Sequence, residues 1–359
     1  MGPMQFVTGV VQRYSWGDPS FIPSLLDVAD DGAPWAELWL GTHPGGPASL
    51  DDGTALSATV GELPYLLKVL AAGEALSLQT HPSRSQAGAG FAREEAAGIP
   101  RNAANRIYRD AHPKPELICA LTPFDALCGF RPIVSSTELL DELGLTVVAT
   151  RLRKHGLPAM VRALYRGGIE LEPIVEACRS QMRAEARLVA HLAEQYPHDP
   201  SVAVTLLMHR VQLAPGEAIF LGPGNLHAYL SGAGIEIMSA SDNVVRGGLT
   251  IKHVDVDELL DVLDIRAIDD PRITPVEATP GSWRYDTRDT PFRLWRCEVA
   301  GPFRHIATGR ELVICTDGGT DLIDRGQTMV LLPGETLELA GIATLFRVEE
   351  MPTGGRQAG

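Results

Sequence analysis

The stretch Leu76-Ser77-Leu78-Gln79-Thr80-His81-Pro82 alternates apolar and polar side chains and ends at a proline, a pattern typical of a short β-strand. Residues two apart on a strand point to the same face, so the Gln79 amide and the His81 imidazole can converge on one ion. Both groups carry lone pairs that bind divalent metals. The stretch therefore predicts a strand that presents two metal ligands, although a single Q-x-H pattern is common in proteins.

Two further segments contain residues of the same kind. Glu116 begins a second β-like run, and His227 opens a third element after a Gly-Pro-Gly-Asn turn at residues 222–225. Two imidazole nitrogens and two oxygens suit zinc, and the neutral amide keeps the ion Lewis acidic. We therefore predict a zinc site of Gln79, His81, Glu116 and His227. Taken singly, Glu116 could instead cap a turn, and His227 could be an ordinary loop histidine.

Composition and charge indicate a globular protein that binds neither nucleic acid nor membranes. The chain has 359 residues, of which 45% are hydrophobic and 21% charged, so it is long enough for two or three compact units. Its formal net charge of −14 argues against binding to nucleic acid or to an anionic membrane. An anionic substrate would therefore have to be attracted by local basic residues.

The cysteines and the N-terminal sequence predict a cytoplasmic location. The five cysteines are Cys119, Cys128, Cys178, Cys297 and Cys315. They are odd in number, scattered and never spaced C-x-x-C, so we interpret them as buried thiols in a reducing compartment. Residues 1–20 contain no basic segment followed by an apolar run, and no apolar stretch approaches transmembrane length.

The hydrophobic pattern predicts a mainly β protein with a helical insertion. Short β-like runs separated by Gly and Pro turns occupy the first and last thirds of the chain, as in a jelly-roll β-sandwich. Residues 86–97 predict a helix within the first of these regions. Between the two β regions, Ser135-Ser136-Thr137-Glu138 is a capping-box signature, residues 147–164 have a helical period broken at Gly156, and residues 171–195 form a longer amphipathic pattern.

A short repeat suggests that the β regions are related. The turn Pro215-Gly216-Glu217 beside an apolar strand is echoed at Pro333-Gly334-Glu335. We interpret the chain as two related β-sandwich units, of which only the first keeps metal ligands. The second contains His305, but no partner at ligand spacing.

Several longer motifs follow one another in a fixed order. They are Y-S-W-G (14–17), A-E-L-W-L-G-T-H-P (36–44), L-L-K-V-L (66–70), N-R-I-Y-R-D (105–110), F-D-A-L-C-G-F-R-P (124–132), residues 225–236, and S-D-N-V-V-R-G-G-L-T (241–250). Together with the ligand segments they resemble type I mannose-6-phosphate isomerase, a zinc-dependent family of the cupin superfamily. The last motif is the most specific, because nothing generic about a β-sandwich requires it.

The resemblance implies a cupin domain interrupted by an insertion. We expect residues 1–133 and 201–258 to form the catalytic cupin domain, with His227 and Arg246 in its second part. Residues 134–200 are expected to be the helical insertion, residues 259–352 a C-terminal jelly-roll domain, and residues 353–359 a disordered tail.

The resemblance also implies a reaction. An isomerase of this family interconverts mannose 6-phosphate and fructose 6-phosphate by moving a proton between carbons 1 and 2 through a cis-enediol(ate). One zinc ion per chain would be held by the four predicted ligands. Arg246 is expected to act in catalysis and to contact phosphate or enediolate oxygens with paired donors. Further candidates are Lys114, Asp242 and Glu236 for catalysis, and Lys252 and Tyr229 for substrate binding. The identity of the general base stays open.

One histidine position departs from this pattern. The family usually has a histidine immediately before the lysine that matches Lys114, whereas this chain has Pro113 there and His112 one residue earlier. Either His112 fills the same space, or that histidine is dispensable. We interpret His43 as a turn residue outside the site.

Two other classes of function are open from the sequence. One is another metal-dependent cupin, such as a glucose-6-phosphate isomerase or a dioxygenase, although a dioxygenase would favour three histidines and a carboxylate and would not need the S-D-N-x-x-R motif. The other is a non-catalytic sugar-binding cupin, which would be expected to lose ligands or Arg246. We expect a monomer that binds a small hexose 6-phosphate.

Overall fold

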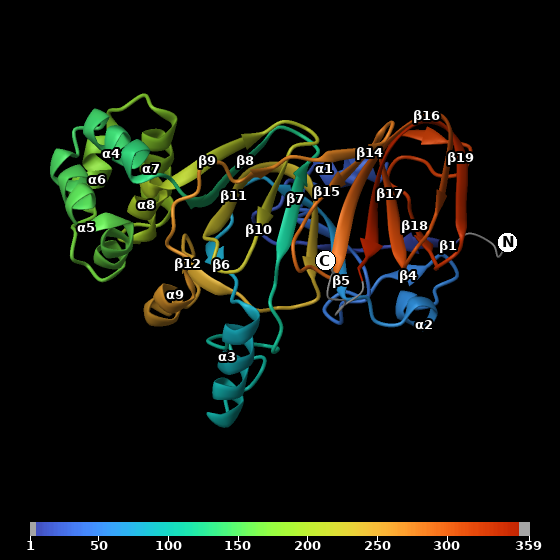
Figure 1. Cartoon of the computed structure of the whole chain (residues 1–359), viewed down its shortest axis with the longest axis horizontal. Helices are drawn as coiled ribbons and strands as arrows, with labels where there is room; N and C mark the ends of the chain where they lie inside the picture. Colours follow the sequence, from blue (N-terminus) through green and yellow to red (C-terminus); the bar gives the residue numbers. More distant parts are fainter. Residues whose placement is uncertain (1–4, 352–359) are drawn as a thin grey trace, which may run out of the picture.

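The computed structural model describes residues 5–351 and shows an elongated molecule (Figure 1). The strands β16 (Phe292–Ile306) to β19 (Thr336–Glu350) lie at one end, and the helices α4 (Ile133–Glu142) to α8 (Ser201–Val204) lie at the other. A second set of strands lies between them, and α3 (Arg84–Ala96) projects from this middle part. The predicted tail at residues 353–359 falls outside the described residues.

The middle part contains two sheets that share one long strand, β11 (His227–Ser239). Residues 232–239 of β11 pair with β5 (Tyr65–Ala72), whereas residues 227–231 pair with β8 (Phe124–Phe130). Gly232 lies where the strand changes partner, at φ +106°, and a Cβ there would meet the Pro123 carbonyl oxygen at 2.5 Å. The strand therefore crosses from one sheet to the other at a position that only glycine fits.

The remaining strands of this unit complete the two sheets. The first sheet runs β13-β10-β7-β11-β5-β3-β2, and β6, β8, β9 and β12 join the second through β11. Their bounds are β2 (Val10–Gln12), β3 (Glu37–Leu40), β6 (Leu78–Thr80), β7 (Glu116–Ala120), β9 (Met208–Leu213), β10 (Ala218–Leu221), β12 (Val245–Gly248) and β13 (Arg272–Ile273). The mainly β architecture of stacked sheets confirms the predicted fold class.

The C-terminal sheet includes strands from the beginning of the chain. Its order is β14-β15-β16-β19-β17-β18-β1-β4, and Gln5 and Phe6 of β1 (Gln5–Thr8) pair with Val330 and Met329. The other strands are β4 (Ser49–Leu50), β14 (Val276–Thr279), β15 (Ser282–Tyr285), β17 (Glu311–Thr320) and β18 (Thr328–Leu331). Residues that we assigned to the first domain thus complete the sheet of the second, which local sequence patterns do not reveal.

The two Pro-Gly-Glu turns have the same geometry. Gly216 and Gly334 have φ values of +87° and +84°, a region that favours glycine. In each turn the glutamate accepts a 2.8 Å bond from a backbone N–H three residues earlier: Ala214 donates to Glu217, and Leu332 donates to Glu335. This shared turn supports the interpretation of two related β units.

The helical region contains more breaks than the sequence indicated. Gly156 has φ +77° inside α5 (Thr146–Tyr165), at the predicted break. The predicted pattern at 171–195 is two helices, α6 (Glu172–Arg179) and α7 (Ala184–Gln195). The chain continues through α8 into the short 3-10 helix Thr205–Leu207. Buried side chains such as Leu152, Val189 and Leu207 form one apolar cluster with Leu78 of the middle unit, so the helices pack on the sheet that carries β6.

The predicted capping box was wrong in position. Helix α4 begins at Ile133 with Pro132 at the N-cap, so Ser135 and Glu138 lie inside the helix. A capping box is present instead at α3, where Ser83 accepts a bond from the Gln86 backbone N–H and Gln86 accepts one from the Ser83 backbone N–H. Proline fixes a φ suited to a helix start, so Pro132 outweighs the serine pattern.

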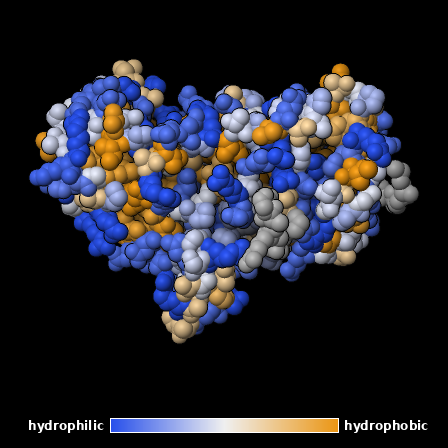
Figure 2. All heavy atoms as spheres, viewed as in Figure 1, coloured by the Kyte–Doolittle hydropathy of each residue, from blue (hydrophilic) through white to orange (hydrophobic). Residues whose placement is uncertain are grey.

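The surface is mixed in character. Hydrophilic residues cover most of the viewed face, and apolar residues gather at the helical end (Figure 2). Three short helices, α1 (Phe21–Leu25), α2 (Leu56–Val60) and α9 (Val256–Val262), lie elsewhere in the chain. Within residues 5–351, no helix combines the length and the apolar character that crossing a bilayer requires.

Candidate metal centre

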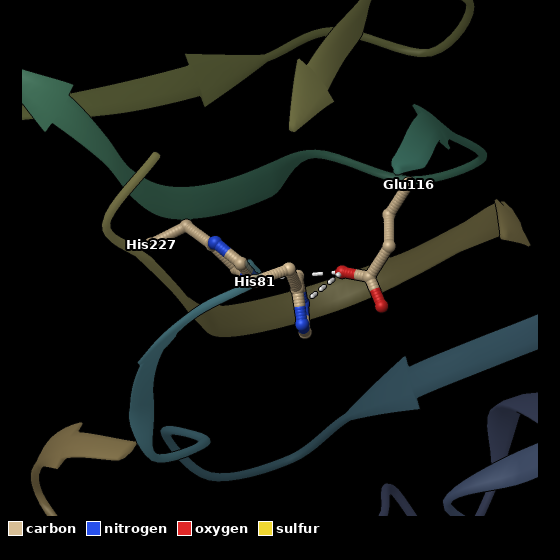
Figure 3. Close-up of side chains that lie close together, drawn as sticks. All are labelled: His81, Glu116 and His227. Carbon is tan, nitrogen blue, oxygen red and sulfur yellow. Dashed lines mark ion pairs between the residues drawn. The ribbon is translucent and has the colours of Figure 1, made fainter. Parts of the chain in front are cut away.

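Three side chains from three different strands meet between the two sheets of the middle unit (Figure 3). His81 directly follows β6, Glu116 is the first residue of β7, and His227 is the first residue of β11. Their ligand atoms all lie within 4.8 Å of one another. Glu116 Oε2 is 3.2 Å from Nε2 of His81 and 3.4 Å from Nε2 of His227. No other cluster of three or more His, Cys, Asp or Glu with metal-ligand geometry occurs among the described residues.

Backbone carbonyls fix the tautomers of both histidines. Nδ1 of His81 lies 2.8 Å from the Asn243 carbonyl oxygen, and Nδ1 of His227 lies 3.0 Å from the Asn225 carbonyl oxygen. A carbonyl oxygen only accepts hydrogen bonds, so both Nδ1 atoms carry the proton. Both Nε2 lone pairs are therefore free and directed at the same carboxylate, as metal ligation requires.

Buried polar atoms without hydrogen-bond partners also fit a cation at this position. His81 Nε2 and Glu116 Oε2 are buried and have no hydrogen-bond partner. Burial and the Lys114 charge lower the pKa of His81, although Glu116 opposes this, so the imidazole is neutral. Burial alone raises the pKa of Glu116, but His81, Lys114 and His227 together hold it well below its usual range. Neutral imidazoles and an ionised carboxylate are the protonation states that bind a divalent metal.

Gln79 lies beside this cluster. It pairs with His227 across β6 and β11, and its Nε2 is 3.4 Å from Nε2 of His227. A half-turn about the last side-chain bond exchanges the positions of the amide nitrogen and oxygen. In the described orientation the amide nitrogen faces His227, so this rotation is needed for the oxygen to face a shared metal; the structure places Gln79 beside the three other predicted ligands.

Lys114 contacts the cluster, although not from a strand. Its Nζ lies 2.9 Å from Glu116 Oε1, and the side chain is buried. Lys114 is two residues before Glu116, and β7 begins only at Glu116. Lys114 therefore approaches the carboxylate from the preceding turn.

A buried charge network lies on the sheet that also carries Glu116. Lys68 Nζ is 2.9 Å from Glu236 Oε2 and 3.4 Å from Glu37 Oε1, and the Tyr229 hydroxyl donates to Glu236 Oε1 at 2.9 Å. Lys68 and Glu236 are direct cross-strand partners on β5 and β11. The Trp39 indole N–H donates to Glu37 at 2.6 Å. Tyr229, a predicted substrate-binding residue, thus uses its hydroxyl within the network.

The network sets the protonation of its members. Burial alone lowers the pKa of Lys68, but Glu236, Glu37 and Glu116 raise it above its ordinary value, so Lys68 is an ammonium. Burial raises the pKa of Glu236; Lys68 opposes this, and Glu116 and Glu37 reinforce it. Sequence reasoning missed Lys68 and Glu37. The available signal was one lysine in the apolar strand L-L-K-V-L, every residue of which is buried.

Asp242 has an unexpected partner. His43 Nε2 lies 3.4 Å from Asp242 Oδ1, and the Gly45 backbone N–H donates to His43 Nδ1 at 3.2 Å. The His43 hydrogen bond is the main cause that lowers the pKa of Asp242, against the effect of burial. His43 thus contacts a predicted catalytic residue, a contact that its interpretation as a turn residue did not include.

Arg246 lies next to the predicted ligand Gln79 and near a second arginine. It pairs with Gln79 across β12 and β6. Burial and the charge of Arg109 lower its pKa. Within residues 5–351, no ion pair includes Arg246 or Arg109, so both guanidiniums are available to an anion. Lys252 is exposed in the loop after β12, and the His112 side chain is exposed.

Comparison with known proteins identifies the family. Residues 50–133 match the model of the phosphomannose isomerase type I catalytic domain. The chain is 37% identical over 288 residues to mannose-6-phosphate isomerase from Salmonella typhimurium, covering 72% of this chain and 74% of that protein. Mannose-6-phosphate isomerase from Escherichia coli K12 is 35% identical, covering 72% of this chain and 74% of that protein. The enzyme of the same name from Schizosaccharomyces pombe is 30% identical, covering 90% of this chain and 91% of that protein. The chain belongs to the type I phosphomannose isomerase family.

Solved structures of this phosphomannose isomerase family have the same fold. The apo form from Salmonella typhimurium has a TM-score of 0.86 and 30% identity, covering 98% of this chain and 100% of that one. The Salmonella structure bound to substrate (F6P) and zinc has a TM-score of 0.84 and 30% identity, covering 97% of this chain and 99% of that one. The resemblance that we drew from the sequence motifs is therefore confirmed, as is the cupin fold that it implied.

Proposed function

We propose that the protein is a zinc-dependent aldose–ketose isomerase that interconverts mannose 6-phosphate and fructose 6-phosphate. The observation that carries this proposal is the buried His81–Glu116–His227 cluster, in which both imidazole Nε2 lone pairs point at one carboxylate. Membership of the phosphomannose isomerase family supplies the substrate class. We also propose that the four predicted ligands hold one zinc ion per chain.

The donor set fits zinc better than a hard cation. Two imidazoles, one carboxylate and one amide give two nitrogens and two oxygens, whereas calcium and magnesium prefer oxygen ligands only. A bound zinc ion supplies a Lewis acid that stabilises negative charge developing on the oxygens of the sugar.

We propose that Arg246 binds the anionic substrate beside the metal ligands. Its guanidinium has no carboxylate partner among the described residues, and Arg109 nearby adds a second positive charge. Two adjacent like charges repel one another, so an anion between them is stabilising. Paired N–H donors suit phosphate or enediolate oxygens. Lys252, exposed on the following loop, extends this positive region within an acidic chain.

We propose Glu236 as the general base for the carbon-bound proton. A carboxylate takes up a proton more readily when its pKa is raised above the ordinary value. The pKa of Glu236 is raised, whereas that of Asp242 is lowered by His43. Lys68 holds Glu236 in place as an ammonium, and Lys114 shares the Glu116 carboxylate. Asp242 is then a candidate for orienting the sugar hydroxyls.

The alternatives drawn from the sequence have less support. The cluster contains two histidines and one carboxylate, not the three histidines that a cupin dioxygenase would favour. A non-catalytic cupin would have no need of Arg246 facing a ligand strand. We propose further that the protein is a cytoplasmic monomer, which is consistent with five buried cysteines that form no disulfide.

An assay that couples fructose 6-phosphate formation to a reporter enzyme tests the proposed function. Mannose 6-phosphate and glucose 6-phosphate should be compared on untreated, chelated and zinc-restored protein. We expect conversion of mannose 6-phosphate that chelation abolishes and zinc restores. Conversion of glucose 6-phosphate alone, or undiminished turnover by metal-free protein, would contradict the proposal.

A further inference from the structure

Asn243 uses every hydrogen-bonding position of a fully buried side chain. Its Oδ1 accepts from the backbone N–H groups of Arg109 at 2.7 Å and Asp110 at 3.2 Å. Its Nδ2 donates to the backbone carbonyls of Asp110 at 2.8 Å and His112 at 2.9 Å. The side chain has 0% exposure. An amide has two donor hydrogens and two acceptor lone pairs, so all four are satisfied and the amide orientation is unambiguous.

The segment that Asn243 holds has no secondary structure of its own. Residues 109–113 lie in neither a helix nor a strand, yet they lead directly to Lys114 and Glu116. Their other bonds also reach the Asn243 loop: the Ser241 hydroxyl and the Asp242 N–H donate to Asp110, each at 3.0 Å. The Asn243 side chain therefore replaces the strand pairing that this segment lacks.

The main chain of the same residue contacts a second part of the site. The Asn243 carbonyl accepts the Nδ1–H of His81 at 2.8 Å and thereby directs Nε2 of His81 at Glu116. One residue thus links the His81 strand end, the segment that leads to Glu116, and the loop that continues to Arg246. Loss of a group that orients a metal ligand in this way typically lowers metal affinity or activity by about 10- to 100-fold.

We propose that Asn243 is a positioning residue that sets the distance between His81 and Glu116 by joining the 109–113 segment to the carbonyl that orients His81. The role in catalysis rests on the proposed isomerase function, whereas the role in metal binding does not. Only a short side chain that both donates and accepts meets these contacts. Aspartate has the same shape, but it would lose both donated bonds and place a second carboxylate against Asp110, whose Oδ1 lies 3.3 Å from Nδ2.

The test compares Asn243→Asp and Asn243→Ala with wild type. The control is Asn102→Asp, the same change at an exposed residue in the stretch between α3 and β7. Zinc affinity is measured by competition with a chromophoric chelator, and turnover with mannose 6-phosphate is measured in parallel. We expect zinc affinity to fall by about tenfold or more and kcat to fall with it. Hydrogen exchange at the amides of residues 109 and 110 should accelerate without a change in circular dichroism. Asn102→Asp should match wild type in each measurement.

Several outcomes overturn the proposal. Zinc affinity and kcat within about twofold of wild type in both Asn243 variants would show that the metal centre does not need this residue. Loss of the native circular dichroism spectrum in both variants would mean that Asn243 serves the whole fold and not the site. If wild type itself fails to turn over mannose 6-phosphate, the isomerase proposal fails, while zinc affinity and hydrogen exchange still decide the role of Asn243.

Discussion

Gln79 and Arg246 are direct cross-strand partners on β6 and β12, and Gln79 also faces His227 across β6 and β11. Directly opposed residues on neighbouring strands share one face of a sheet. The His227 imidazole, a proposed metal ligand, thus forms a row with the Gln79 amide and the Arg246 guanidinium across three strands. A substrate that bridges the metal and Arg246 needs oxygens at both ends, as a sugar phosphate or its enediolate has.

Arg246→Ala should retain zinc and the fold but lose most of its turnover. If the guanidinium contacts charge that develops in the transition state, kcat should fall by about a hundred- to a thousandfold, roughly 3–4 kcal/mol. Arg246→Lys should rescue poorly, because one ammonium cannot provide paired donors. Arg266→Ala, at an exposed arginine, is the matched control. Steady-state kinetics with mannose 6-phosphate measure these effects. Values of kcat and KM near those of wild type in Arg246→Ala would show that Arg246 has no role in catalysis.

Glu236→Gln should separate proton transfer from metal binding. Glutamine keeps the shape, but its single oxygen replaces only one of the two acceptors that Tyr229 and Lys68 use, and it cannot take a proton from carbon. We expect kcat to fall by about a hundredfold or more with zinc content unchanged. Exchange of solvent deuterium into the C2 position of mannose 6-phosphate should fall in parallel. If exchange and turnover persist at wild-type rates, another residue is the base; Glu298→Gln at the surface serves as control.

His43→Phe should shift the pH dependence of the reaction. The His43 hydrogen bond lowers the pKa of Asp242, so its removal raises that pKa and moves the acid limb of kcat/KM toward higher pH. His43→Gln, which can still donate, should shift it less. The pH profiles of both variants are compared with that of His191→Phe, a change at an exposed helical position. Superimposable profiles would mean that Asp242 does not titrate in the rate-determining state.

The C-terminal unit should depend on pH through Glu311. Burial alone raises its pKa, but His305, 2.9 Å away, and Arg347, 2.8 Å away, hold it below the usual value. A depressed pKa in the folded state stabilises the fold above the unfolded value of about 4.3, and this stabilisation is lost as pH falls through the folded pKa. Glu311→Gln should cost about 3 kcal/mol at neutral pH and flatten the acid decline of Tm.

The comparison for Glu311 is an exposed ion pair in the same sheet. Glu338 pairs with Arg304 at 2.9 Å, with both side chains more than half exposed. Glu338→Gln should change stability by less than about 1 kcal/mol. Urea unfolding at several pH values measures the change in the free energy of unfolding for both variants. Equal losses in the two variants would show that the buried cluster contributes no more than a surface pair.

The four ligand candidates could be predicted because each lies in a short local pattern. Gln79 lies on β6 and His81 directly follows that strand, two residues later, and Glu116 and His227 each begin a strand. The helical break at Gly156 was also local, since a positive φ there favours glycine. The positions of these features depend on their immediate neighbours along the chain.

The remaining parts of the site depend on contacts between distant segments. Lys68 meets Glu236 only because β5 and β11 pair in one register, and His43 meets Asp242 only because two loops pack together. The pairing of β1 with β18 is likewise set by the tertiary fold. The spacing of apolar residues and the positions of turn residues do not specify which distant strands and loops meet. Local patterns also misplaced the capping box, where Pro132 decided the helix start.

The most direct test measures zinc content and turnover together in wild type and Glu116→Ala. Elemental analysis should find one zinc ion per chain in wild type and almost none in the variant, because the two imidazoles and the amide cannot hold the ion against water. Turnover of mannose 6-phosphate should be lost on chelation of wild type, return with added zinc, and stay absent in the variant. Full zinc occupancy or wild-type turnover in Glu116→Ala would contradict a metal centre built on His81, Glu116 and His227.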